Sequence, residues 1–140
     1  MDSRFLKIYF CGSIRGGRRD QELYEEIICF LQEFGSVLTE HVGEKNLKTD
    51  TNLSDSEIYT RDIAWLQSAD FVIAEVSTPS LGVGFEIATA LSMNKKILCL
   101  AQDNKNERLS AMIKGCPDLQ TSLYSGIEEA KNKIRIFLND

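Results

Sequence analysis

The sequence contains little proline and histidine, and it has no long apolar run. Its 140 residues include 2 Pro, 1 His and 1 Trp. Scarce proline argues against a disordered or collagen-like chain. No apolar stretch approaches the roughly 18 residues that a membrane-spanning helix needs, and the opening MDSRFLKIYF does not resemble a secretory signal. We therefore expect one soluble domain over residues 1–140, working in the cytoplasm or the nucleus.

An excess of positive charge is also missing. The 16 Lys and Arg stand against 21 Asp and Glu, which gives a formal net charge of -5. A nucleic-acid polymer needs a basic footprint, so it is not an expected partner, and a phosphate ligand would have to be bound locally. The 4 Cys include no C-x-x-C pair, and three of them lie in apolar segments. We expect neither a metal site nor disulfides.

Short apolar runs alternate with segments of helical periodicity along the chain. The expected strands are 5–11, 36–39, 71–76, 96–101 and 122–124, and the expected helices are 18–34, 54–68, 83–93 and 127–138. Ser54 and Glu57 form a capping-box pattern at the start of the second helix. The polar segments 40–53 and 102–109 lack periodicity, which predicts loops.

This alternation predicts an α/β fold, a doubly wound five-stranded parallel sheet of the flavodoxin or Rossmann-like kind. The simplest strand order is 2-1-3-4-5, in which the first and third strands are neighbours. The loops 12–17 and 77–84 follow these two strands, so they should face each other across a crevice at the carboxyl ends of the strands.

The loop 12–17, GSIRGG, has the glycines and the following helix start that suit an anion. Arg15 or Arg18 would add a guanidinium group. The loop is neither a Walker loop nor G-x-G-x-x-G, so a tight β-to-α turn with solvated arginines remains an alternative.

Two acids in helices are candidates for chemistry. Asp62 has apolar neighbours three and four residues away, which places it on the buried stripe of its helix. It either pairs with Arg61 or acts as a general acid with a raised pKa. Glu86 follows Gly82 and Gly84, which leave space for a substrate, although a glutamate near a helix start also suits the helix dipole.

Four other polar residues carry weaker signals. Tyr9 either points its phenol into the crevice or belongs to the core. His41 is the one histidine, and without a G-x-S-x-G elbow or a suitable cysteine we expect it at the pocket rim and not as a base. Asp70 and Glu75 are interpreted as structural groups near strand ends.

Five segments together closely resemble the 2'-deoxynucleoside 5'-phosphate N-hydrolases of the nucleoside 2-deoxyribosyltransferase superfamily. They are YFCGSIRGG (9–17), LTEHV (38–42), RDIAWLQSAD (61–70), AEVSTPSLGVGFE (74–86) and LSAMIKG (109–115). The similarity covers nearly the whole chain in the right order, and the segment 43–57 and the C-terminal helix depart from it.

The resemblance implies hydrolysis of the N-glycosidic bond of deoxynucleoside monophosphates without a metal or cofactor. Glu86 would be the nucleophile, Tyr9 would hold its carboxylate, and Asp62 would donate a proton to the departing base. The implied substrate-binding residues are Gly12, Ser13, Ile14, Arg15, Gly16, Ser80, Gly82, Ser110 and Met112. Ser110 would come from the neighbouring subunit, which implies a homodimer, and Met112 would lie near the base.

Two alternatives remain open. A deoxyribosyltransferase would pass the sugar to a second base; similar transferases carry an acid at position 80, whereas Ser80 adds no charge that would repel a phosphate, so we favour the hydrolase. A nucleotide sensor without catalysis would leave Glu86 as a helix-dipole residue. The sequence names neither the preferred base nor the role of the segment 43–57.

Overall fold

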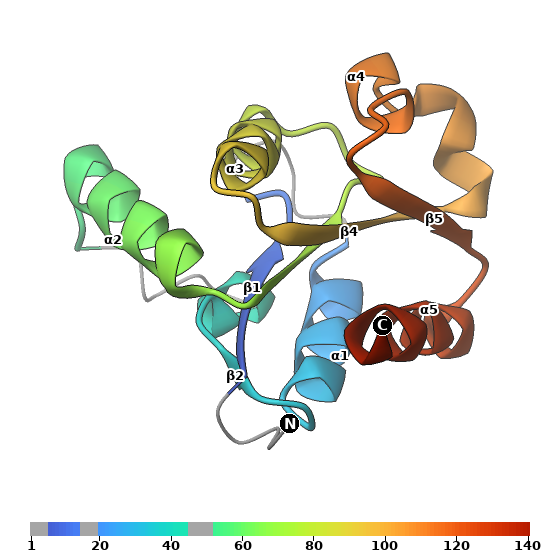
Figure 1. Ribbon diagram of the computed structural model, residues 1–140, viewed down its shortest axis with the longest axis horizontal. Helices are drawn as coiled ribbons and strands as arrows, with labels where there is room; N and C mark the ends of the chain where they lie inside the picture. The colour runs from blue at the N-terminus through green and yellow to red at the C-terminus, as the bar shows by residue number, and fades with distance from the viewer. Residues whose placement is uncertain (1–5, 15–19, 45–51) are drawn as a thin grey trace.

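The computed structural model describes residues 6–14, 20–44 and 52–140. Its sheet has five parallel strands in the order β2-β1-β3-β4-β5 (Figure 1), which confirms the predicted order. The strands are β1 (Lys7–Cys11), β2 (Ser36–Val37), β3 (Phe71–Glu75), β4 (Lys96–Gln102) and β5 (Gln120–Tyr124). Tyr9 is in register with Val72, so β1 and β3 lie side by side and their carboxyl ends share one edge.

Helices cover both faces of the sheet. They are α1 (Gln21–Leu31), α2 (Asp55–Ser68), α3 (Leu81–Ser92), α4 (Ala111–Lys114) and α5 (Ile127–Asn139). Figure 1 shows α1 and α5 on one face and α2 and α3 on the other. Side chains alternate along β1, so Ile8 and Phe10 pack in the core under α1 and α5, while Tyr9 and Cys11 pack in the core under α2 and α3.

The predicted helix starts follow from capping. At α2, Ser54 Oγ accepts from the Glu57 amide and Glu57 Oε1 accepts from the Ser54 amide, each at 3.1 Å, so the predicted capping box is confirmed. The third helix begins at Leu81, two residues before its predicted start, because Ser80 Oγ accepts from the Val83 amide at 3.3 Å.

Three short helices lie where none was expected. The predicted loop 40–53 begins with the 3-10 helix η2 (Glu40–Gly43), and the predicted loop 102–109 contains the 3-10 helix η4 (Asp103–Arg108). The third is α4. None of the three is long enough to show a hydrophobic period, which is why the pattern missed them. Among the described residues, no helix combines the length and apolarity needed to cross a membrane.

The cysteines occupy three environments. Cys11 and Cys99 are buried, as their apolar segments predicted, and Cys116 is partly buried. Cys29 is exposed, which corrects the expectation drawn from its apolar segment. Its neighbour Ile28 faces the core, and successive residues of a helix turn by about 100°, so Cys29 is directed away from the sheet.

Candidate active site

A tyrosine from the sheet and a glutamate from a helix meet at the centre of the candidate site. Tyr9 is fully buried in β1, and its hydroxyl donates a hydrogen bond to the carboxylate of Glu86 in α3. Of the two sequence alternatives for Tyr9, a phenol directed at the crevice and a core side chain, the structure realises both, because the ring is in the core and the hydroxyl reaches the acid.

The surroundings change the acid–base properties of this pair. Burial raises the pKa of Glu86 to about 7, while the Tyr9 hydrogen bond acts against that rise and the charge of Asp62 adds to it. Burial and the adjacent Glu86 raise the pKa of the Tyr9 phenol far above its ordinary value, so Tyr9 stays protonated and remains a donor. A carboxyl group whose pKa is moved close to neutral pH by burial and by a neighbouring charge is typical of a catalytic group.

Asp62 faces this pair from α2. Its side chain is 24% exposed, and its Oδ1 accepts from Arg61 Nε at 2.9 Å and from Arg61 Nη2 at 2.8 Å. Its charge also contributes to the raised pKa of both Tyr9 and Glu86. Of the two alternatives that the sequence offered, the pairing with Arg61 is observed, and the role of a general acid stays a prediction.

Arg61 belongs to a cluster that the sequence pattern did not reveal. Its Nη2 lies 3.3 Å from His41 Nε2, and its guanidinium group lies 4.6 Å from the centroid of the Trp65 ring. His41 is buried in η2 with 3% exposure, which corrects its expected place in a loop at the pocket rim. The spacing of Arg61 and Trp65 on one helix face was a usable signal, whereas the contact with His41 depends on the tertiary fold.

The first loop is described only in part. Gly12, Ser13 and Ile14 are described, whereas Arg15 and Gly16 lie outside the described residues. A Cβ on Gly12 would meet the Tyr24 ring at 2.9 Å. Packing against Tyr24 alone therefore requires a glycine at this position. The Ser13 amide donates to the Tyr24 hydroxyl at 3.0 Å, and Ser13 is fully buried.

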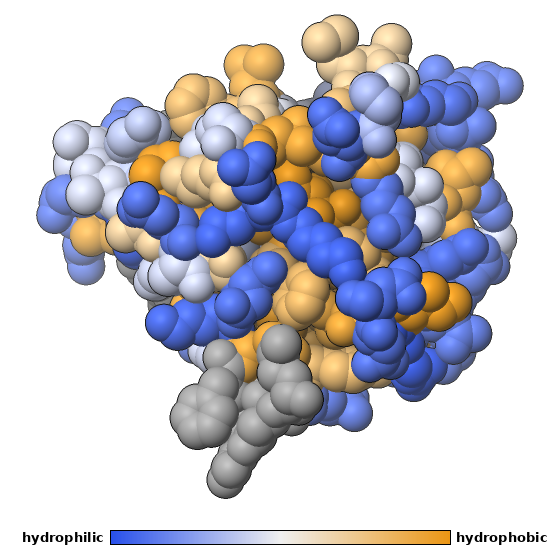
Figure 2. All heavy atoms as spheres, viewed as in Figure 1, coloured by the Kyte–Doolittle hydropathy of each residue, from blue (hydrophilic) through white to orange (hydrophobic). Residues whose placement is uncertain are grey.

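Three of the remaining predicted residues, Ser80, Ser110 and Met112, border a groove between α3 and the η4–α4 segment, and Gly82 is not part of its lining. It encloses about 890 Å³ and is lined mostly by apolar side chains, together with Thr78, Ser80, Arg108 and Ser110. Met112 also lines it and is 82% exposed. In Figure 2 apolar side chains gather between α3 and α4. Glu86 is not part of this lining, so the predicted residues divide into one group around Glu86 and another at the groove.

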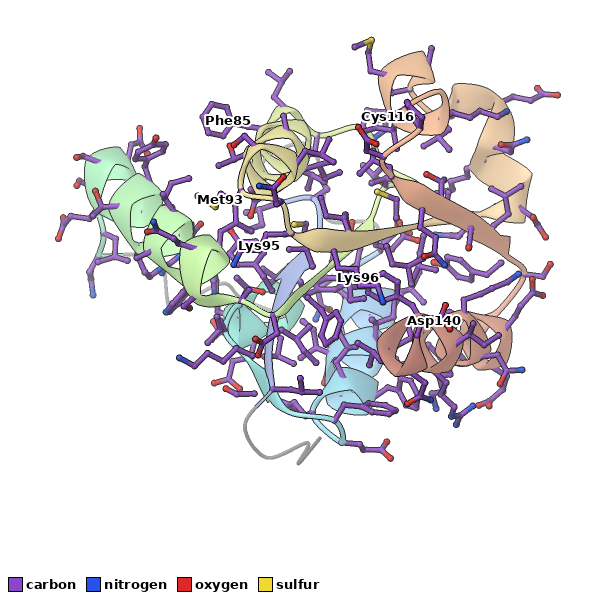
Figure 3. All side chains as sticks on the ribbon, in the orientation of Figure 1. Phe85, Met93, Lys95, Lys96, Cys116 and Asp140 are labelled. Atoms are coloured by element: carbon purple, nitrogen blue, oxygen red, sulfur yellow. The ribbon has the colours of Figure 1, made fainter. Side chains whose placement is uncertain are left out.

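Helical geometry explains that division. Ile87 lines the groove, whereas Phe85 projects from α3 on the side of α2 (Figure 3), where its ring centroid lies 6.1 Å from that of Tyr59. Gly84 would admit a Cβ without a contact inside 4 Å, and a Cβ on Gly82 would meet only Ser80 Oγ at 3.9 Å. The two glycines thus leave open space beside the start of α3, as their positions before Glu86 suggested.

The two acids interpreted as structural have structural partners. Asp70 Oδ2 accepts from the Lys7 amide at 2.8 Å. Glu75 is fully buried and accepts from the Ser77 amide at 2.7 Å, from Ser77 Oγ at 3.0 Å and from the Tyr124 hydroxyl. Within the described part of the chain, no group of three or more His, Cys, Asp or Glu is arranged to hold a metal ion.

The fold and the site built around Glu86 and Asp62 point to a class of protein. Comparison with known proteins shows which family it is. The family model for nucleoside 2-deoxyribosyltransferase matches residues 8–132, and the chain belongs to this family. A 5-hydroxymethyl-dUMP N-hydrolase of Tetraodon nigroviridis is 51% identical over 113 residues, which span 79% of this chain and 80% of that protein. A 5-hydroxymethyl-dUMP N-hydrolase of Danio rerio is 50% identical over 112 residues, 79% of this chain and 78% of its own.

A solved structure extends the comparison to the fold. The Clostridium botulinum CMP N-glycosidase BcmB superposes with a TM-score of 0.69 at 22% identity and covers 94% of this chain and 98% of its own. At this level of identity the likeness concerns architecture, and it agrees with the sheet order β2-β1-β3-β4-β5.

Proposed function

We propose that this protein hydrolyses the N-glycosidic bond of 2'-deoxynucleoside 5'-monophosphates and releases a free base and 2-deoxyribose 5-phosphate. The observation that carries the proposal is the Glu86 carboxylate, which is held by Tyr9, faced by Asp62 and raised in pKa to about 7. The names of the relatives, which are hydrolases of 5-hydroxymethyl-dUMP, support this class of substrate.

Glu86 acts first as a nucleophile. Its carboxylate oxygen attacks the anomeric carbon of the sugar, and the bond from that carbon to the base nitrogen breaks with its electron pair leaving on the base. The base takes a proton, and a glycosyl ester of Glu86 remains. Water then attacks the same carbon and passes a proton to the Asp62 carboxylate that the first step left, and Glu86 leaves as a carboxylate. Tyr9 stabilises the carboxylate through its hydrogen bond at the start and at the end of this cycle.

Asp62 supplies the proton to the departing base. It lies on α2, near enough to Glu86 for its charge to raise the pKa of that carboxyl group. A general acid at this place needs a proton, and the bond with Arg61 favours the ionised form, so the substrate must change this pairing when it binds.

The phosphate is bound at the carboxyl edge of the sheet, by the loop 12–16 and by Ser80. Ser80 Oγ accepts from its own helix, which leaves its hydroxyl proton to donate, and it brings no negative charge toward a phosphate. We also propose that a second copy of the chain docks on the groove between α3 and α4 and completes the site with its Ser110. Apolar lining and exposed side chains such as Leu81, which is 97% exposed, favour such a partner.

A second function is favoured by the family itself. The matching family model carries the name of a transferase, and the glycosyl ester of Glu86 would serve either reaction. The absence of an acid at position 80 favours the hydrolase. The reactions differ in whether water or a second base attacks the sugar.

A panel of substrates tests the proposal. We expect free base and 2-deoxyribose 5-phosphate from deoxynucleoside monophosphates, 5-hydroxymethyl-dUMP among them, and little release from ribonucleotides or from deoxynucleosides that lack the phosphate. Chromatography of the products gives the rates. A second free base is added in a parallel series, and formation of a new deoxynucleotide in place of the free sugar phosphate would overturn the hydrolase assignment.

Substitution of Ser80 or Ser110, which line the groove, should weaken binding of the substrate phosphate. We expect Ser80→Ala and Ser110→Ala each to raise the KM for a monophosphate about fivefold to tenfold, since each change removes one hydrogen bond to a charged group, and to alter cleavage of the nucleoside little. Light scattering should give twice the chain mass of 15.8 kDa. Equal losses on both substrates, or a monomer with full activity, would contradict this arrangement.

A further inference from the structure

Asp20 stands at the N-cap position of α1 but does not cap that helix. An aspartate at this position usually accepts a hydrogen bond from the first turn of its own helix. Here the side chain makes no such bond. Its Oδ2 accepts instead from Thr78 Oγ1 at 2.9 Å, its Oδ1 accepts from Gln102 Nε2 at 3.3 Å, and Lys105 Nζ lies 4.0 Å from Oδ1. The carboxylate is therefore used for contacts between segments far apart in the chain.

These contacts converge on the segment that leads from β3 into α3. Thr78 lies two residues before Ser80 and is 8% exposed. The residue before it, Ser77, is fixed separately, because its amide and hydroxyl donate to Glu75 and its Oγ accepts from the Gln102 amide at 2.8 Å. Ser77 is thus anchored to the sheet, while Thr78 is anchored through Asp20 to the start of α1.

Asp20 brings together the two segments on which the proposed phosphate site depends. One is the connection from β1 to α1, which ends at Asp20, and the other is the segment 77–80, which ends at Ser80. A carboxylate beside a phosphate site opposes anion binding by its charge. The Asp20 carboxylate is occupied by the donors Thr78 Oγ1 and Gln102 Nε2 and by the nearby Lys105. It therefore fixes the spacing between the two segments and does not attract the ligand.

We propose that Asp20, acting through Thr78, is a positioning residue that sets the place of Ser80 for the 5'-phosphate of the substrate. This inference rests on the proposed function and adds to it a residue that does not touch the substrate. The Asp20–Thr78 bond controls affinity for the phosphate group, while the chemistry at Glu86 proceeds independently of it once the substrate is bound.

A matched pair of substitutions at Thr78 tests this role. Thr78→Val keeps the shape of the side chain and removes the donor, whereas Thr78→Ser keeps the donor. We expect Thr78→Val to raise the KM for a deoxynucleoside monophosphate about tenfold, with kcat changed less than twofold, and Thr78→Ser to restore the KM to within about twofold of wild type. Asp20→Ala should give the same rise, and the double variant should add nothing to it.

Two measurements separate positioning from loss of folding. Thr78→Val should cleave the deoxynucleoside without phosphate at the wild-type rate, and its melting curve should stay cooperative. Inorganic phosphate is the second probe: it should raise the melting temperature of the wild type and of Thr78→Ser at concentrations where it does not affect Thr78→Val. A KM unchanged by Thr78→Val, or an equal loss on the nucleoside, would refute the role of Asp20.

The melting experiment with inorganic phosphate also distinguishes a failure of the Asp20 inference from a failure of the proposed function. A wild-type protein that cleaves no deoxynucleoside monophosphate defeats the proposed function, and the phosphate-dependent shift of the melting temperature still measures the effect of Thr78→Val. Equal shifts in wild type and Thr78→Val would overturn the inference even where hydrolysis is found.

Discussion

Glu86→Gln is expected to lower the rate of base release by about a thousandfold or more, because an amide oxygen does not form the glycosyl ester. Glutamine has nearly the same shape and still offers an oxygen to the Tyr9 hydroxyl, so the variant should fold and bind a deoxynucleoside monophosphate. Product chromatography measures the rate, and calorimetry on the same preparation measures binding. Turnover near the wild-type level in Glu86→Gln would exclude a covalent role for this residue.

The pH dependence of the wild type provides a second measurement on the same group. With a Glu86 pKa of about 7, the nucleophile is progressively protonated as the pH falls, and kcat/KM should drop about tenfold per pH unit below that value. Folding responds in the opposite direction. Since the ordinary pKa is 4.5 and the folded value is about 7, ionisation destabilises the fold, and the wild type should lose stability relative to Glu86→Gln as the pH rises through this window.

Asp62→Asn is expected to slow base release by about a hundredfold to ten-thousandfold, the usual contribution of a general acid. Asparagine removes the proton that the departing base takes. The loss should therefore be largest for bases that leave poorly as anions and much smaller for a deoxynucleotide with an activated leaving group. Rates across a series of leaving groups test this dependence.

Arg61→Gln is the matched control for Asp62. It breaks the pairing at 2.8 Å and leaves the carboxyl group in place. If Asp62 only organises α2 through Arg61, both variants should lose the same activity and show the same response to every leaving group. A dependence on the leaving group like that of the wild type in Arg61→Gln, together with a steeper dependence in Asp62→Asn, assigns the proton to Asp62.

The fold followed from sequence because its signals are local and repeated. Strand 71–76 and helix 127–138 each match an observed element to within one residue at each end, and the capping box at Ser54 fixed the start of α2. The second strand was predicted to end at 39 but ends at Val37, because Thr39 turns its hydroxyl back to the Phe10 carbonyl and amide of β1 at 2.7 and 2.8 Å. A hydrogen bond between distant segments produces no periodic pattern in the sequence.

Only part of the candidate site could be predicted from the sequence. Asp62, Glu86 and Tyr9 were candidates from their positions in the sequence, the family resemblance implied their roles, and the structure brings the three together. The Arg61–His41 contact and the Asp20–Thr78 bond join residues 20 and 58 positions apart, so no local pattern could indicate them. Gly12 shows the converse, since a motif suggestive of a ligand also satisfies the packing of Tyr24.

Helix α3 connects the Glu86 carboxylate with the groove, because it contributes residues to both. One face carries Glu86 toward Tyr9, and the adjoining face, about 100° around the helix, carries Ile87 into the groove of about 890 Å³. A turn of about 10° about the helix axis would move a carboxylate at the end of a glutamate side chain by about 1 Å, a displacement that can change a rate about a hundredfold. The orientation of α3, which also forms one wall of the groove, therefore sets the angle at which the Glu86 carboxylate is presented.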